Sequence, residues 1–275
     1  MTGDDHVLAR DLAGQAGTRL LELRAQGGDP DVLRKAGDRL SHEFLTAALA
    51  GARPGDVVLS EEGADNPARL TARRVWIVDP LDGTREFGEP GRTDWAVHVA
   101  LWESDALLAP GGTTLPALPP AAAGPNPPGN LVAGAVALPA QDRVLSTAEP
   151  PPPLAAGEAP TRIRVVVSRS RPPQFVRNIS GLIDAELVPL GSAGAKVAAV
   201  INGEVDAYVH GGGFYEWDTA APVAVARAAG LHASRIDGSD LAYNQADLLM
   251  PDILVCRPAI AGVLLQAIRE VTHAP

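Results

Sequence analysis

The sequence has little cysteine, few basic residues and no long apolar run. Cys256 is the single cysteine among 275 residues, so the chain can form no internal disulfide and no cysteine-rich zinc site. Its apolar spacing is typical of a core position. Lysine and arginine number 23 against 33 acidic residues, and the net charge of −10 argues against a broad nucleic-acid-binding surface.

No apolar run approaches the roughly 20 residues of a membrane span. The first residues, Met1–His6, also lack the basic and then apolar pattern of a signal peptide. We therefore expect a cytoplasmic protein that has neither a membrane nor a nucleic-acid polymer as partner.

With 46% hydrophobic and 20% charged residues, the chain has the composition of a globular protein. Proline, alanine and glycine dominate residues 104–130, which predicts a loop or insert without a packed core. A second proline-rich stretch at 148–160 predicts the boundary between two halves. The expected division is an N-terminal α+β half, 1–148, and a C-terminal α/β half, 160–275.

Apolar spacing predicts a helix over 4–26 and a second helix from Asp38 to Gly51, after Lys35-Ala36-Gly37. The other predicted helices are 174–182, 191–202, 216–230 and 258–271, and the predicted strands are 57–60, 76–78, 94–101, 131–138, 143–146, 162–168, 185–189, 205–210, 231–235 and 252–256. Strands and helices alternate in the second half, which predicts helices covering a mixed sheet.

One strand ends in two aspartates. Trp76, Ile77 and Val78 run into Asp79-Pro80-Leu81-Asp82-Gly83-Thr84, the pattern of a buried strand followed by a tight turn. Two carboxylates held close repel each other unless a cation lies between them, and magnesium takes carboxylate, carbonyl and water oxygens. An ordinary surface turn is the alternative, because Asp, Pro and Gly are common turn residues.

Other acids stand at comparable places. The strand 57–60 runs into Glu61 and Glu62, whereas Asp38 and Asp218 stand where helices are predicted to begin. For both of these aspartates, helix capping is the alternative to a role in chemistry. The segment Gly191–Lys196 also opens a predicted helix, whose N–H groups and Lys196 side chain could seat an anion or simply form an N-cap.

Three motifs then fall in order along the chain: Ser60–Glu62, Asp79–Thr84 and Trp217–Pro222. Together they resemble the inositol monophosphatase superfamily of lithium-sensitive, magnesium-dependent phosphatases. The resemblance covers nearly the whole chain apart from the proline-rich insertions, and three motifs in order are more specific than any one alone. It implies an α/β (α+β) fold, a layered αβαβα sandwich of the inositol monophosphatase and fructose-1,6-bisphosphatase type.

Finer features are similar to one branch, the 3'(2'),5'-bisphosphate nucleotidases, in their bacterial CysQ type and actinobacterial form. These features are Thr84–Phe87, Ser168–Ser170 and Gly191–Lys196. Two positions depart from the pattern. A Val-Thr-x-x-Asp motif is reduced to Lys35–Asp38, and the nucleotidase histidine after Ser-Arg-Ser is Arg171.

The resemblance implies a site with two to three Mg2+ ions. Glu61, Asp79 and the Leu81 carbonyl would hold one ion, and Asp79, Asp82 and Asp218 the second, so that Asp79 bridges them. A third, weaker ion would depend on Glu61 and water.

The implied catalytic residues are Thr84, which orients the attacking water, and Glu61 or Asp38, which takes its proton. The implied or candidate substrate-binding residues are Asp82, Gly83, Thr84, Ser168, Arg169, Arg171, Ser192 and Lys196. The basic members of this set are the candidates for a second phosphate, which a site rich in carboxylates cannot hold without cations.

The expected partner is therefore a small phosphorylated substrate. The leading hypothesis is hydrolysis of 3'-phosphoadenosine 5'-phosphate to AMP, with its sulfate ester PAPS as a further substrate. Inositol monophosphatase or fructose-1,6-bisphosphatase activity is the alternative, and a non-catalytic regulatory relative is the alternative from another class. A homodimer is compatible with the resemblance, and the sequence leaves the oligomeric state open.

Overall fold

The computed structural model of the chain describes residues 4–105, 128–154, 161–170 and 172–272. Most of the predicted insert at 104–130 and part of the predicted boundary therefore lie outside the described residues. The helices are α1 (Asp5–Ala25), α2 (Pro30–Ala52), α3 (Thr84–Gly88), α4 (Gln174–Leu182), α5 (Ala193–Ile201), α6 (Glu216–Ala228) and α7 (Pro258–Thr272), with 3-10 helices η1 (Pro67–Thr71) and η3 (Pro139–Gln141). No helix in these ranges is long and apolar enough to cross a bilayer.

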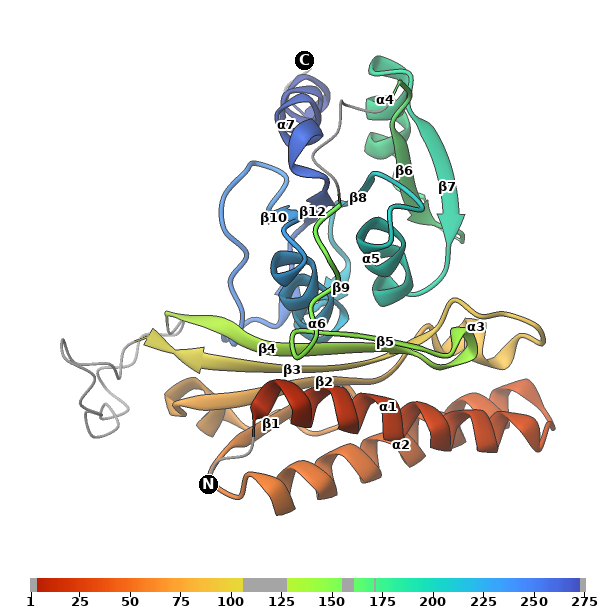
Figure 1. Ribbon diagram of the computed structural model, residues 1–275, viewed down its shortest axis with the longest axis vertical. Coiled ribbons are helices and arrows are strands. Elements are labelled where there is room, and N and C mark those ends of the chain that lie inside the picture. The colour runs from red at the N-terminus through yellow and green to blue at the C-terminus, as the bar shows by residue number, and fades with distance from the viewer. Residues whose placement is uncertain (1–3, 106–127, 155–160, 171, 273–275) are drawn as a thin grey trace.

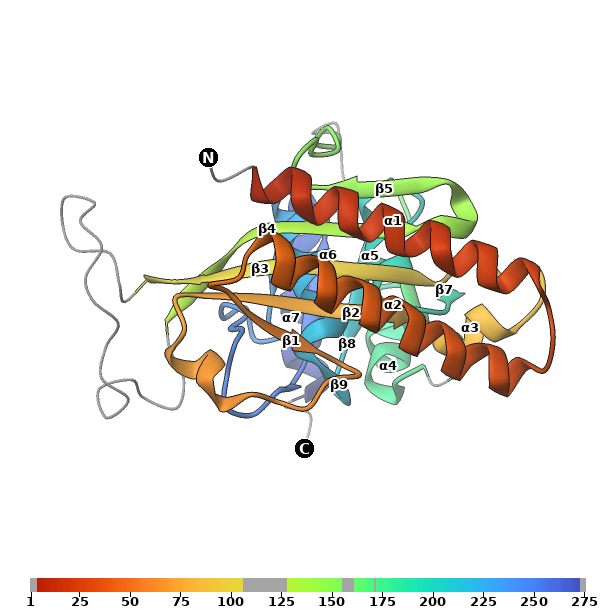
Figure 2. The ribbon, with the colours of Figure 1, turned by 90° about the horizontal axis from the view of Figure 1, so that it is seen from below.

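The first sheet contains β1 (Val57–Ser60), β2 (Arg74–Asp82), β3 (Ala96–Ser104), β4 (Gly129–Leu138) and β5 (Arg143–Ser146). These strands lie in chain order, with β1 parallel to β2 and the other neighbours antiparallel. α1 and α2 cover one face of the sheet, as Figure 2 shows from below. Leu20, Leu45 and Trp76 are buried in the core between these helices and the sheet.

The second sheet contains β6 (Arg164–Ser168), β7 (Glu186–Leu190), β8 (Ala207–His210), β10 (His232–Ser234) and β12 (Ile253–Cys256); β9 (Phe214–Tyr215) and β11 (Leu249–Met250) pair separately. The strand order is β10-β12-β8-β6-β7. β6 is parallel to β7 and β8, whereas the other pairs are antiparallel, which confirms the predicted mixed sheet. Along β6, Val165 and Val167 pack in the cluster with α4 and α7, and Val166 packs with α5 and α6.

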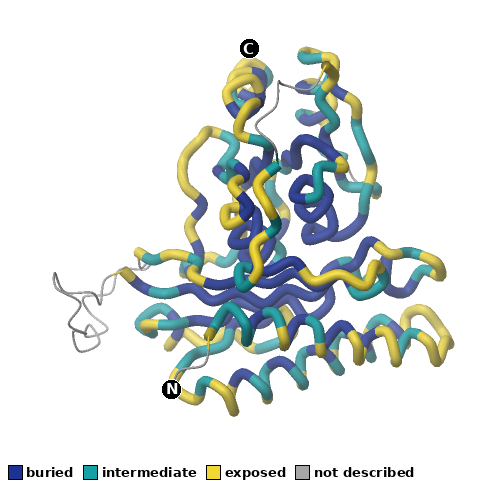
Figure 3. Tube along the Cα trace, in the orientation of Figure 1, coloured by how far each residue is buried: buried dark blue, intermediate teal, exposed yellow. Residues whose placement is uncertain are grey.

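The layers therefore run α1 and α2, first sheet, α5 and α6, second sheet, α4 and α7 (Figure 1). This arrangement confirms the predicted αβαβα sandwich. α5 is buried along its whole length, as the dark tube in Figure 3 shows, because it lies between the two sheets. The N-terminal ends of α5 and α6 meet the first sheet close to the end of β2.

The predicted start of the second helix was wrong. α2 begins at Pro30 with Asp29 as its N-cap, and Asp38 lies inside it. Gly37 does not break the helix; its missing side chain leaves room for α3. A Cβ there would lie 2.8 Å from Phe87 Cε1 and 2.9 Å from Leu81 Cδ2.

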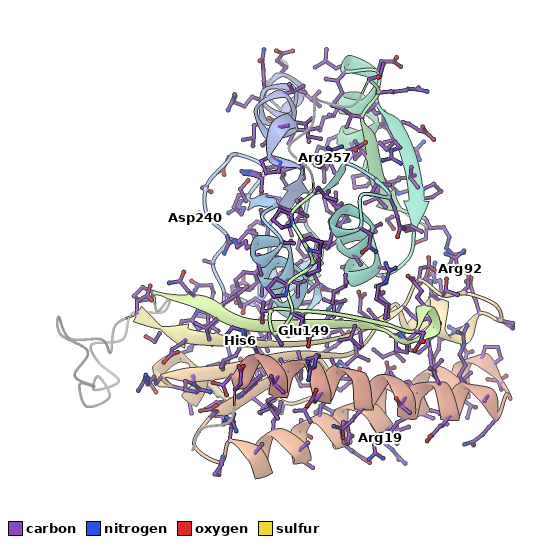
Figure 4. The ribbon with its side chains drawn as sticks, viewed as in Figure 1. His6, Arg19, Arg92, Glu149, Asp240 and Arg257 are labelled. Carbon is purple, nitrogen blue, oxygen red and sulfur yellow. The ribbon has the colours of Figure 1, made fainter. Side chains whose placement is uncertain are left out.

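The chain leaves the first sheet beside the start of α1. His6 Nδ1 lies 2.8 Å from Thr147 Oγ1, and Arg10 forms an ion pair with Glu149 at 3.0 Å. Figure 4 labels His6 and Glu149 in this region. The first sheet ends at Ser146 and the second begins at Arg164, on either side of the predicted boundary. The division of the chain into two folding units stays a prediction.

Candidate active site

The turn at the end of β2 is buried and irregular. Asp79 pairs with His98 of β3 and Asp82 with Ala96, and the register shifts between these two pairs. The Leu81 N–H donates to Asp79 Oδ1 at 3.0 Å, which fixes the bend. Asp79 is 1% exposed and Asp82 7%, so the surface-turn alternative is wrong.

Gly83 allows the chain to pass from β2 into α3. Its φ of 82° lies in the left-handed region, and an added Cβ would lie 3.0 Å from Ser192 Cβ and 3.2 Å from the Asp94 carbonyl oxygen. Glycine is therefore required here both by backbone conformation and by space.

Asp218 reaches the same point from α6. One carboxylate oxygen each of Asp79, Asp82 and Asp218 lie within 4.8 Å of one another. α6 begins at Glu216, as predicted, but its N-cap residue is Tyr215, so Asp218 lies in the first turn and not at the cap position where it was expected. Asp218 still assists the helix start, since its Oδ2 accepts from the Tyr215 N–H at 2.6 Å. Asp218 therefore both bonds the start of α6 and belongs to the acidic cluster.

Glu61 stands at the outer edge of this cluster. The residue as a whole is exposed, yet its carboxyl group hydrogen-bonds the Asp79 carboxyl. Burial raises the pKa of Glu61 to about 7, and the charges of Asp218 and Asp82 add to this rise, whereas the bond from Asp79 opposes it. Burial and the neighbouring acids Glu61, Asp82 and Asp218 raise the pKa of Asp79 well above its ordinary value.

Asp82 differs from the other acids because it faces donors. Its Oδ2 accepts from Ser192 Oγ at 2.5 Å and Gly194 N at 2.6 Å, and its Oδ1 from Ala193 N at 3.1 Å. Burial would raise the pKa of Asp82, but His98, Lys196 and Ser192 lower it to about 2. The N–H groups predicted to seat an anion at the start of α5 thus hold the carboxylate of Asp82.

His98 is a residue that the sequence analysis left out of the site. It is 0% exposed; its Nδ1 lies 3.1 Å from the Trp217 carbonyl oxygen, and its Nε2 lies 3.2 Å from Asp82 Oδ2, a contact that falls short of hydrogen-bond alignment. Although burial would lower the pKa of His98, Asp82 raises it. The signal that could have found it is strand register, since His98 pairs with Asp79.

Asp38 and Thr84 meet on the α2 side of the turn. The Thr84 hydroxyl lies 3.0 Å from the Leu81 carbonyl oxygen and 3.3 Å from Asp38 Oδ1. Burial raises the pKa of Asp38 to about 6, with a contribution from Glu62, while the Thr84 hydrogen bond opposes the rise. Asp38 can therefore exchange a proton near neutral pH, although it lies within a helix and caps none.

A cavity of about 550 Å³ opens beside the cluster, between Asp82 and Asp218 on one side and residues of the second sheet on the other. Four predicted substrate-binding residues line it: Asp82, Ser168, Ser192 and Lys196. The Lys196 ammonium is buried and donates to the Ser192 carbonyl at 2.7 Å and the Gly191 carbonyl at 3.2 Å. Burial lowers the pKa of Lys196, and the charge of Asp82 opposes this effect.

The cavity also has aromatic lining residues. Phe175, Phe214 and His210 line it, with the His210 and Phe214 ring centroids 5.0 Å apart. Burial and the charge of Lys196 lower the pKa of His210 to about 4, so its ring is neutral at physiological pH.

Of the two predicted arginines, Arg169 is not among the described residues that line this cavity. Arg169 donates to Glu86 Oε1 at 2.7 Å and to Glu89 Oε1 at 3.0 Å. Arg171 lies outside the described residues. The substrate-binding roles of both stay predictions.

The three clustered aspartates fit a hard divalent cation. They offer only oxygen atoms, they are gathered at one point, and the pKa of Asp79 and that of Asp218 are raised by burial and mutual repulsion. A cation among them would relieve that repulsion. Chemically, the arrangement can hold a metal beside a cavity large enough for a small phosphorylated molecule.

Comparisons with known proteins agree with this geometry. A Mycobacterium leprae protein named 3'-phosphoadenosine 5'-phosphate phosphatase is 49% identical over 270 residues, 97% of this chain and 94% of its own. CysQ from Bacteroides thetaiotaomicron aligns with a TM-score of 0.72 at 26% identity, covering 92% of this chain and 97% of that one.

The likeness to inositol monophosphatase II from Staphylococcus aureus MSSA476 concerns the fold alone. Its TM-score is 0.74 at 20% identity, over 96% of this chain and 95% of that one. The model of the inositol monophosphatase family matches residues 9–273, nearly the whole sequence. With the motifs, the layers and the acidic cluster all in agreement, the chain belongs to the inositol monophosphatase family.

Proposed function

We propose that this protein is a magnesium-dependent phosphatase that hydrolyses the 3'-phosphate of 3'-phosphoadenosine 5'-phosphate to give AMP and phosphate, with PAPS as a further substrate. The observation that carries the proposal is the clustered carboxylates of Asp79, Asp82 and Asp218 beside a cavity, in a chain 49% identical to a protein named for this activity.

Two groups of ligands are proposed. Glu61, Asp79 and the Leu81 carbonyl would hold one Mg2+, and Asp79, Asp82 and Asp218 the other. A third ion would depend on Glu61. When bound, such cations polarise the phosphate and make water acidic enough to attack at neutral pH. The raised pKa values of Asp79 and Asp218 support this assignment, because repulsion among unpaired acids is what a cation relieves.

Side chains of the protein then orient the attacking water and accept its proton. The Thr84 hydroxyl orients the attacking water, and Asp38 or Glu61 accepts its proton. The raised pKa of Asp38, about 6, suits a group that exchanges protons near neutrality. The backbone N–H groups of Gly83 and Thr84 hold the scissile phosphate. Ser168, Ser192 and Lys196 are proposed to contact the second phosphate, because all three line the cavity.

A substrate panel tests this proposal. Phosphate release is measured under matched Mg2+ for 3'-phosphoadenosine 5'-phosphate, PAPS, inositol monophosphate and fructose 1,6-bisphosphate. We expect the highest kcat/KM for the bisphosphonucleotide and loss of activity on metal removal or in tens of millimolar Li+. A higher kcat/KM for inositol phosphate would overturn the choice of substrate. Inertness toward every ester despite bound Mg2+ would instead favour a non-catalytic relative.

A further inference from the structure

A buried polar network ties the loop after Glu61 to the loop before β11. Arg69 of η1 is 1% exposed, and its Nε donates to Asp65 Oδ1 at 2.6 Å. Its Nη1 donates to Asn244 Oδ1 at 3.0 Å and to the Gln245 carbonyl at 2.8 Å. Asn244 returns the contact, since its Nδ2 donates to the Arg69 carbonyl at 2.9 Å.

The network continues into α6. Glu216 is the first residue of that helix and is 1% exposed. Its carboxylate accepts from the backbone N–H groups of Asn244 at 2.6 Å and Gln245 at 2.7 Å. Asn244 has a φ of 58°, a left-handed conformation that presents both N–H groups to Glu216 and its side chain to Arg69.

Both ends of this network lie close in sequence to proposed metal ligands. Asp65 follows Glu61 by four residues, and Glu216 precedes Asp218 by two. Glu61 and Asp218 come from segments far apart in sequence and are proposed to hold different ions that share Asp79, so they must be placed accurately relative to each other for both ions to bind. No atom of the network's side chains is among the unpaired buried polar atoms of the described residues, and a fully bonded network of this kind is rigid.

We propose that Arg69, Asn244 and Glu216 are positioning residues that fix Asp218 relative to Glu61 and thereby set the protein's affinity for its divalent cation. None of the three belongs to the acidic cluster. The inference rests on the metal dependence proposed above, and its readout is cation binding rather than turnover.

Asn244→Gly tests the link. Glycine accepts a φ of 58° without strain and keeps both N–H bonds to Glu216, so the variant removes only the side-chain bonds to Arg69. We expect the Mg2+ concentration that half-saturates the rise in melting temperature to increase about tenfold, the usual effect of removing support behind a metal ligand. At saturating Mg2+, kcat should stay within about twofold of the wild-type value. Arg69→Lys, a milder variant, should shift Mg2+ binding in the same direction.

Arg235→Lys is the matched control. Arg235 makes a bidentate ion pair with Asp252, at 2.7 and 2.6 Å, beside β10 and β12. This variant should lower the melting temperature while leaving the half-saturating Mg2+ concentration unchanged. The contrary result is that Asn244→Gly and Arg69→Lys also lower the melting temperature while leaving the half-saturating Mg2+ concentration unchanged. In that case the network is structural only and the inference is wrong.

The proposed function fails in a different way. A wild-type protein that Mg2+ stabilises but that releases no phosphate from any ester contradicts the phosphatase, while the comparison of variants still decides the positioning role. A wild-type protein that Mg2+ does not stabilise overturns both.

Discussion

Two buried aspartates of this chain have opposite surroundings. Asp206, before β8, is 1% exposed, and its Oδ2 accepts from the Arg164 N–H at 2.9 Å while Arg257 lies 3.4 Å from its Oδ1. Figure 4 labels Arg257 in the second half, away from the first sheet. Asp79 is equally buried, but three of its neighbours are the acids Glu61, Asp82 and Asp218, and His98 Nδ1 lies 4.0 Å from its Oδ2.

The different surroundings of Asp206 and Asp79 indicate a structural role for the first and a chemical role for the second. A buried carboxylate with arginine partners is compensated, and removing it leaves those partners unpaired. A buried carboxylate among other carboxylates is repelled, and the folded chain tolerates it by keeping it protonated or by binding a cation. Asp206 therefore serves the fold, whereas the position of Asp79 is explained by the metal that it is proposed to hold.

Asp79→Asn should give the largest effect. It removes the proposed bridging ligand, and loss of several kcal/mol of charge stabilisation lowers kcat/KM about a thousandfold. Without Mg2+ its free energy of unfolding should not fall, because asparagine resembles the protonated acid that the raised pKa of Asp79 implies. Phosphate release measures kcat/KM, and urea unfolding measures the free energy of unfolding.

Asp206→Asn is the control for that comparison. It should lower the free energy of unfolding by about 1–3 kcal/mol, since it weakens buried bonds to Arg164 and Arg257. Its kcat/KM should remain near the wild-type value. The reverse result, with Asp79→Asn active and Asp206→Asn inactive, would contradict the distinction.

His98→Gln should have the next largest effect. The ring contacts Asp82 and the Trp217 carbonyl, and losing support behind a proposed metal ligand lowers metal affinity or activity roughly 10–100-fold. His232→Gln, which changes a partly buried histidine of β10, should leave both unchanged. Equal responses of the two variants would show that the His98 contact is dispensable.

Lys196→Met should raise KM about tenfold for 3'-phosphoadenosine 5'-phosphate, the worth of one charged hydrogen bond. Inositol monophosphate, which has no second phosphate, is the internal control, and its KM should change little. An equal rise for both substrates would mean that Lys196 supports Asp82 and the start of α5 and does not read the second phosphate.

The smallest effect is on thermal stability as pH changes. Burial is the main cause that raises the folded-state pKa of Asp218 and that of Asp38 to about 6, whereas the unfolded value is about 4. Between these two pH values the folded chain therefore binds more protons than the unfolded chain. Without metal, the contribution of these two groups to stability is therefore present at low pH and is lost as pH rises from about 4 to 7. Mg2+ should raise the melting temperature more at pH 7.5 than at pH 5, by on the order of 5 °C. An equal rise at both pH values would contradict this.

Local features of the sequence predicted much of the fold and the acids of the site. Asp79 and Asp82 follow an apolar strand with Pro80 and Gly83 beside them, and α4 was predicted at its observed bounds, 174–182. The second helix was misread because Gly37 is typical of a break, whereas here it makes room for Phe87.

Contacts between distant segments could not be read from spacing. His98 reaches Trp217 only after β3 meets α6, and Arg69 reaches Asn244 across 175 residues. The start of α5 had two alternative predictions, an anion seat or a plain N-cap; Ser192 is the N-cap, and no local pattern could show that Asp82 also accepts from the N–H groups there. The two-residue strands β9 and β11 are too short to produce a period.

The most direct test is anomalous diffraction from crystals soaked in Mn2+, which takes the same oxygen ligands as Mg2+. We predict an anomalous peak among the carboxylates of Asp79, Asp82 and Asp218, with a second peak beside Glu61 and the Leu81 carbonyl. Crystals of Asp79→Asn should lose both peaks. Mn2+ bound only elsewhere, or undisturbed peaks in that variant, would mean that these acids are not the protein's metal centre.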